Sequence, residues 1–244
     1  MVAVAVLGTG ALALAGAAPR TDDHVASVLV NSSCAAVAGL LTAWVLCWWK
    51  NRRVRPRAAD FALVPSLRSP VAVFGWTAGP FMALMMIDTA YSALVHPAPQ
   101  DTMRALSDAQ GPQLITLAVL AICIAPVAEE LVCRGVLYQA LRARWRPAVA
   151  APVSAVVFAL PHQDDLKTMP MLITAGVVLC VVVERTGSLV PAIALHSVLN
   201  APAIMAQDGL LGGALLAVML AACAFLLTKS RRAVPEHASG EQPA

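Results

Sequence analysis

Charged residues are scarce in this 244-residue chain, at 13% of the total, whereas soluble domains carry about 25%. Mean hydropathy is +0.74. Together these values exclude an ordinary soluble domain and predict a polytopic, all-α membrane protein. Nucleic-acid binding has no support, because the cations behind the formal net charge of +3 cluster in loops, which is the pattern of a topology signal.

Motifs that hold metals or disulfides are missing as well. The six cysteines show no CxxC spacing and are scattered through apolar segments, which indicates small buried hydrophobic residues. The HExxH motif of zinc proteases is absent. There is also no internal repeat of the kind that many transporters contain.

Long apolar segments are abundant, and we expect about eight transmembrane helices in one bundle. The segments are 2–18, 26–49, 69–95, 113–141, 148–162, 169–184, 188–206 and 209–228. The first would be a signal peptide or a retained helix, and its lack of a basic n-region favours the helix. We expect one transmembrane domain over residues 1–232, with a motif-bearing core at 113–204, and a disordered cytoplasmic tail at 233–244.

Lysine and arginine positions predict the orientation. With a cytoplasmic amino terminus, the opposite side holds only Arg20, Arg104 and Lys167, and Arg134 lies within a segment. All other cations of the 17 then lie in cytoplasmic loops, which follows the positive-inside rule. We therefore expect a multi-pass cell-membrane protein with both termini cytoplasmic. The Pro- and Ala-rich composition favours a bacterial cytoplasmic membrane.

Three charged residues lie within the fourth apolar segment: Glu129, Glu130 and Arg134. Each charge at membrane depth costs at least ~2.5–3.5 kcal/mol. Residues four apart share a helix face, so Glu130 and Arg134 are predicted to form an ion pair. Glu129 points elsewhere, and a carboxylate facing a cavity with little solvent would serve as a general base. The alternative is a purely structural polar cluster between helices.

Later apolar segments contribute imidazole and amide groups. His196 and Asn200 are four apart on one helical face. From there they could donate hydrogen bonds to an oxyanion or form structural hydrogen bonds to a neighbouring helix. His162 ends its segment and could be a packing or loop residue. His196 lies about 12 Å of helix beyond Ser188, and Glu130 about 18 Å before Arg142. These depths predict one shared cavity that opens toward the cytoplasm.

Taken in order, the polar residues resemble the motifs of the CAAX-protease and bacteriocin-processing (CPBP, or Abi) family of intramembrane endopeptidases. The resemblance covers about residues 113–204, and within the family the chain is similar to the Ras-converting type of CAAX endopeptidase. The motifs are Glu129-Glu130 with Arg134, Phe158 with His162, and His196 with Asn200.

The resemblance implies an eight-helix protease that cleaves a peptide bond in a membrane-associated protein or peptide. Glu129 would activate the attacking water with help from His162, and His196 and Asn200 would stabilise the oxyanion. Glu130 and Arg134 would brace the site. The expected partners are membrane lipid and that substrate, whose identity the sequence does not specify, as it does not specify the oligomeric state.

Two questions stay open at the level of sequence. Glu129, His162 and His196 would be an acceptable ligand set for Zn²⁺, although we favour a mechanism without an obligatory metal. The chain could instead be a catalytically silent immunity or regulatory protein of the same fold. A transporter or proton pathway is a third interpretation, because intramembrane carboxylates and histidines also serve there.

Overall fold

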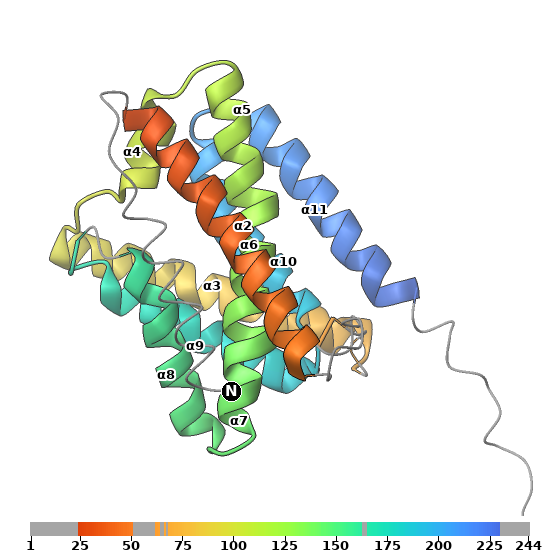
Figure 1. Ribbon diagram of the computed structural model, residues 1–244. Coiled ribbons are helices and arrows are strands. Elements are labelled where there is room, and N and C mark those ends of the chain that lie inside the picture. Colours follow the sequence, from red (N-terminus) through yellow and green to blue (C-terminus); the bar gives the residue numbers. More distant parts are fainter. Residues whose placement is uncertain (1–23, 51–61, 64–65, 67, 163–164, 230–244) are drawn as a thin grey trace, which may run out of the picture.

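A computed structural model describes residues 24–50, 62–63, 66, 68–162 and 165–229. These residues form a helical bundle without strands (Figure 1), which confirms the all-α prediction. The helices are α2 (His24–Lys50), α3 (Pro70–Val95), α4 (Asp101–Asp108), α5 (Pro112–Val119), η2 (Leu120–Ile124), α6 (Ala125–Glu130), η3 (Leu131–Tyr138), α7 (Gln139–Arg142), α8 (Pro147–Ala159), η4 (Leu160–His162), α9 (Met169–Thr186), α10 (Val190–Met205) and α11 (Gly209–Lys229). The predicted segment 2–18 and tail 233–244 lie outside the described residues.

Helix lengths agree with a membrane-spanning bundle. Within the described residues, five helices are long and apolar enough to cross a membrane. The other two apolar helices, Pro147–His162 and Val190–Met205, are shorter. Sixteen helical residues, the length of α10, rise about 24 Å, less than the ~30 Å thickness of a hydrocarbon core. Both short helices carry a histidine of the predicted site.

Proline and glycine mark many of the helix boundaries. Pro70, Pro112 and Pro147 lie in the first turns of their helices, where the missing N–H removes no hydrogen bond. Gly187 ends α9 with φ 66°, a left-handed conformation that glycine adopts without strain. These signals explain why seven of the predicted segments match the observed helices to within a few residues.

One continuous helical stretch, Pro112–Arg142, forms the centre of the bundle. Half of its most apolar window is buried inside the protein, against 6% of the window in α3. α2, α8 and α10 pack directly against it, and α9 and α11 pack as hairpin partners of α8 and α10 (Figure 1). The long stretch carries Glu129, Glu130 and Arg134, so the charged motif lies at the middle of the fold.

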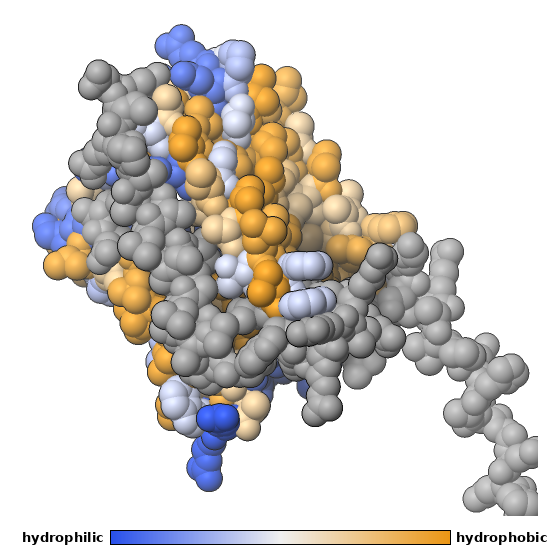
Figure 2. All heavy atoms as spheres, viewed as in Figure 1, coloured by the Kyte–Doolittle hydropathy of each residue, from blue (hydrophilic) through white to orange (hydrophobic). Residues whose placement is uncertain are grey.

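The outer helix faces are apolar. In α2, Val30, Leu41 and Trp44 are each more than half exposed, and Figure 2 shows apolar side chains along the length of the described helices with the most hydrophilic residues toward the ends. In water such a surface would be a large aggregation-prone patch. In a bilayer it is the surface that meets lipid tails.

The two ends of the bundle differ in charge. At one end, here called the basic end, Ala62 and Arg68 contact the end of α9 and the turn after it: Leu189 N donates to Ala62 O (2.9 Å) and Arg68 Nε to Arg185 O (3.2 Å). Arg142, Arg144 and Arg146 lie there too. The opposite, acidic end comprises residues 96–111, 165–168 and 206–208, and it carries Asp101, Asp108, Asp165 and Asp208 against Arg104 and Lys167.

Candidate active site

The centre of the site is a buried ion pair. Arg134 Nη1 donates to Glu130 Oε1 at 2.7 Å, and both side chains are fully buried. The pair is the one that the four-residue spacing predicts. His196 of α10 reaches the same carboxylate oxygen, with Nδ1 3.0 Å from Glu130 Oε1. The ion pair therefore ties the long helix to α10.

Arg134 is also held by α8 and α9. Its Nη2 donates to the carbonyl oxygen of Gly176 at 3.1 Å, and its guanidinium carbon lies 4.4 Å from the centroid of the Phe158 ring. A buried guanidinium needs such partners, because an uncompensated charge in the interior is strongly destabilising. One side chain thus contacts three helices and sets their mutual positions.

A close helix–helix contact makes the Gly176 carbonyl accessible to Arg134. A Cβ atom added to Gly176 would lie 2.7 Å from the Cβ and 2.9 Å from the Cα of Ala155 in α8. Small residues on both helices permit this approach, as is common in membrane bundles. Glycine is therefore needed at position 176 because it has no side chain. A positive φ angle is not the reason, since Gly176 does not have one.

We expect Gly176→Ala to lower the free energy of unfolding by about 1–3 kcal/mol, the usual cost of overpacking, because the backbone of α8 would have to move. Thermal unfolding in detergent measures the effect. Gly75→Ala in α3 is the matched control, since no atom lies within 4 Å of its added Cβ. Equal melting temperatures for the two variants would contradict the importance of this contact.

The contact with Glu130 determines how His196 presents its other ring nitrogen. Glu130, paired with Arg134, acts as an acceptor, so we assign the Nδ1 proton to His196. In the neutral ring Nε2 is then an acceptor, and it lies 3.7 Å from Glu129 Oε2. Glu129 is 26% exposed, unlike the fully buried Glu130. The two adjacent glutamates thus occupy different environments. This is expected, because neighbouring side chains on an α-helix point in directions about 100° apart.

Asn200 is anchored by an irregularity in the long helix. In the π-helical turn η2 the N–H of Ala125 bonds to Leu120 O, and in the same register Ala121 O would face the nitrogen of Pro126, which has no hydrogen. Asn200 Nδ2 donates to that free carbonyl at 2.9 Å. One amide hydrogen is thereby used for packing, and the second remains for another acceptor.

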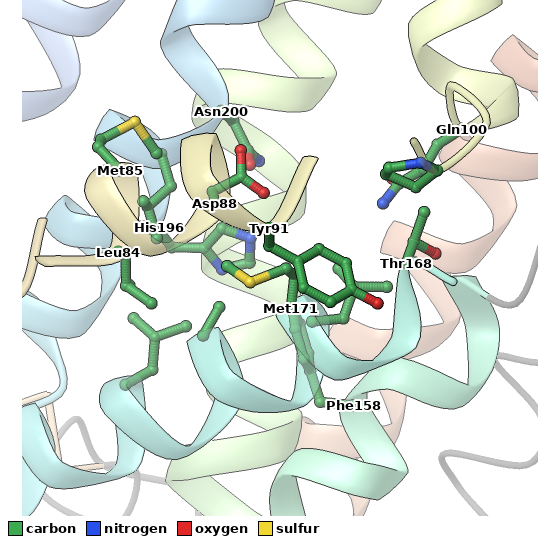
Figure 3. A pocket seen from close by; sticks show the side chains of 15 residues that line it. Leu84, Met85, Asp88, Tyr91, Gln100, Phe158, Thr168, Met171, His196 and Asn200 are labelled. Atoms are coloured by element: carbon green, nitrogen blue, oxygen red, sulfur yellow. The ribbon is translucent and has the colours of Figure 1, made fainter. Parts of the chain in front are cut away.

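A cavity of about 240 Å³ adjoins these residues and is lined by both His196 and Asn200 (Figure 3). Its wall continues through Tyr91, Gln100 and Thr168, which lie toward the acidic end. The sequence predicts a cavity that opens toward the basic loops, whereas the lining of this cavity extends toward the acidic end. Helical depth gives the distance of a residue from a membrane surface, but not the side on which neighbouring helices separate.

The rim of the cavity is held together at the acidic end. Tyr91 Oη donates to Lys167 O and Ala98 N to Asp165 Oδ2, both at 2.7 Å. The backbone N–H groups of Lys167 and Ala98 lower the pKa of Asp165 below its ordinary value by stabilising its charged form. These bonds join the end of α3 to the start of α9.

His162 is close to the site but does not contact the other predicted polar groups through a hydrogen bond. Its Nδ1 lies 3.2 Å from Phe158 O, one turn earlier. The Phe158 ring contacts both imidazoles, with ring centroids 5.3 Å from His162 and 5.7 Å from His196. Glu129 and His162 are not among the residues that line the cavity. Glu129 thus lies next to His196, His196 and Asn200 share the cavity wall, and His162 contacts the Phe158 ring.

The residues proposed as zinc ligands do not come together. Among the residues that the structure describes, no three His, Cys, Asp or Glu side chains are grouped closely enough to hold a metal ion. Glu129 and His196 are adjacent, but His162 is separated from that pair. Two ligands fall short of the three that catalytic zinc sites take from protein, so we derive no step that depends on a metal.

Two contributors to the site are not evident from the sequence motifs. Gly176 supplies a backbone carbonyl to Arg134, and Asp88 of α3 lies in the cavity wall. Gly176 is one small residue in an apolar segment and gives no separate signal. Asp88 does give one, because a carboxylate within an apolar run is costly, although its distance in sequence from the motifs hides the connection.

The fold and the site together define a membrane-embedded helical protein with a buried polar centre. Residues 111–202 match the family described as type II CAAX prenyl endopeptidase, Rce1-like. This match confirms the resemblance to the CAAX-protease family over the motif-bearing segment, and it supports an intramembrane protease at the level of the family. Comparisons with curated proteins and with solved structures found no match for the chain.

Proposed function

We propose that this protein is an intramembrane endopeptidase that hydrolyses a peptide bond in a membrane-associated protein or peptide. The observation that carries the proposal is the 3.7 Å separation of Glu129 Oε2 from His196 Nε2, beside a cavity that His196 itself lines. This separation exceeds a direct hydrogen bond but allows one water molecule to bond to both atoms. The family match over residues 111–202 supports the same chemistry.

In the proposed reaction, a water molecule donates one hydrogen bond to Glu129 and one to His196 Nε2. As its oxygen attacks the scissile carbonyl carbon, Glu129 accepts the proton. The carbonyl electrons move to the oxygen, and the second amide hydrogen of Asn200 stabilises that oxyanion. When the C–N bond breaks, the Glu129 carboxylic acid gives its proton to the leaving amine, which regenerates the carboxylate.

In this mechanism His196 positions the attacking water, whereas the motifs suggested that it stabilises the oxyanion. Because Glu130 engages Nδ1 at 3.0 Å, the neutral ring has an acceptor at Nε2 and positions the water, while Asn200 alone serves the oxyanion. Glu130 and Arg134 act as positioning residues for His196. His162 acts through Phe158, whose ring contacts both imidazoles, and holds the end of α8 against the site.

We place the protein in a cell membrane with the basic end on the cytoplasmic side. The described arginines at that end, including Arg142, Arg144 and Arg185, and the acidic character of the other end support this orientation. We also propose that residues 1–232 form one unit. The substrate would then approach the cavity from the side of the acidic end.

Comparative membrane proteomics tests the proposed activity. Cells that make wild type, Glu129→Ala or His196→Ala are compared for new protein termini and for a membrane protein that accumulates uncut. We expect both variants to accumulate the same uncut protein at unchanged levels of the protease itself. Identical sets of termini in wild type and in both variants would overturn the assignment.

Removal of metal ions is expected to leave the activity intact, because the described residues gather only two of the three proposed ligands. Purified protein is treated with a strong chelator and assayed on the substrate found above. Activity that falls to the level of Glu129→Ala and returns with Zn²⁺ would show that the site assembles around a metal.

A further inference from the structure

A carboxylate in the cavity wall has no part in the proposed chemistry. Asp88 of α3 lines the same cavity as His196 and Asn200, and Figure 3 shows it among the labelled residues around that space. It lies one turn before Tyr91, which anchors the rim. The side chain therefore faces the path along which a substrate segment would reach the reactive centre.

The Asp88 carboxylate has no hydrogen-bond or ion-pair partner within the described part of the chain, and it is exposed. Asp165, the carboxylate at the rim of the cavity, differs in this respect, because it accepts hydrogen bonds from two backbone N–H groups. Asp88 thus has its full charge available for a ligand, whereas Asp165 serves the local structure.

No cation in the cavity wall balances that charge. Of the described lining residues, Asp88 and His196 are the only Asp, Glu, Lys, Arg or His. The buried Arg134 is paired with Glu130 at 2.7 Å, so its charge is compensated. Glu129, 3.7 Å from His196, adds a second carboxylate. A substrate segment entering this space therefore meets a negative potential, which the largely apolar walls of the cavity focus.

We infer that Asp88 makes the cavity select peptide segments with a lysine or arginine close to the scissile bond and disfavour segments with an aspartate or glutamate side chain there. The inference rests on the proposed function and narrows its substrate class. The preferred substrate is accordingly a cationic segment of a membrane-associated protein.

The test uses a pool of nonapeptides, acetylated and amidated, with randomised central positions, and purified protein in detergent. Cleavage products are identified by mass spectrometry. For wild type, we expect Lys or Arg near the cut to be favoured over Glu by about tenfold or more, a ratio expected for one charge pair near a protein surface. In Asp88→Asn the ratio should fall toward one, and in Asp88→Lys it should invert.

Asp108→Lys is the matched control. Asp108 is an exposed residue at the acidic end that does not line the cavity, so the same change of charge there should leave both the ratio and the activity unchanged. An equal change of the ratio in Asp108→Lys and Asp88→Lys would assign the preference to the general charge of that end and overturn the role of Asp88. Equal cutting of Lys and Glu peptides by wild type would overturn it as well.

A binding measurement separates this inference from the proposed proteolysis. Thermal unfolding of wild type and Asp88→Asn is followed with one capped nonapeptide containing a central Lys and with its Glu counterpart. Stabilisation of wild type by the Lys peptide alone, without cleavage of any peptide, would support the selectivity and reject the protease. Cleavage abolished by Glu129→Ala with equal stabilisation by both peptides would support the protease and reject the selectivity.

Discussion

Glu129→Gln should reduce kcat/KM by about 10²–10⁴-fold, the usual contribution of a general base, and leave the melting temperature of the protein unchanged. The side chain is 26% exposed and its nearest polar contact is 3.7 Å away, so few stabilising interactions are lost. Glutamine keeps the shape but does not accept a proton from water. The variant is thus expected to remain folded and inserted but inactive.

The same substitution at the next residue is the control. Glu130→Gln removes the charge that compensates Arg134 and weakens the contact with His196 Nδ1, so both activity and melting temperature should fall. Activity on the identified substrate and unfolding in detergent are measured for the two variants side by side. The division of roles is wrong if Glu129→Gln loses stability or if Glu130→Gln loses only activity.

Local relationships along one helix are predictable from the sequence. The spacing of Glu130 and Arg134 requires only helical geometry, and the structure contains the predicted pair at 2.7 Å. Seven helices also begin and end near the predicted positions, because hydrophobic length and terminal prolines or glycines determine them locally. The separate environments of Glu129 and Glu130 follow from the same geometry.

Relationships between helices are much less predictable. The contact of Arg134 with Gly176 depends on how closely α8 approaches α9, and the π-helical turn that frees Ala121 O for Asn200 depends on Pro126 in a way that no periodicity shows. For the same reason the sequence does not show that the lining of the cavity extends toward the acidic end. His162 is an example. The motif identifies it as a candidate site residue, but its position relative to Glu129 depends on the packing of Phe158.

Arg134→Met should destabilise the protein by about 3–5 kcal/mol, the loss observed when one partner of a buried pair is removed. Glu130 would be left as an unpaired charge in a fully buried position, and the Gly176 carbonyl and the Phe158 ring would lose their cation. The apparent melting temperature in detergent is expected to fall by roughly 10 °C, since each kcal/mol corresponds to a few degrees for a chain of this size.

A second arginine–glutamate pair is the control for burial. We expect the large loss of stability in Arg134→Met because its ion pair is buried, and not because the residue is paired. Arg142 and Glu184 are 2.8 Å apart, as closely paired as Arg134 and Glu130, but their side chains are 28% and 35% exposed. Arg142→Met should therefore cost about 0–1 kcal/mol. The double variant Arg134→Met/Glu130→Gln should be more stable than the sum of its single variants predicts, because neither charge is left alone. Additive losses, or equal losses for Arg134→Met and Arg142→Met, would contradict a buried ion pair that holds α8, α9 and α10 around the site.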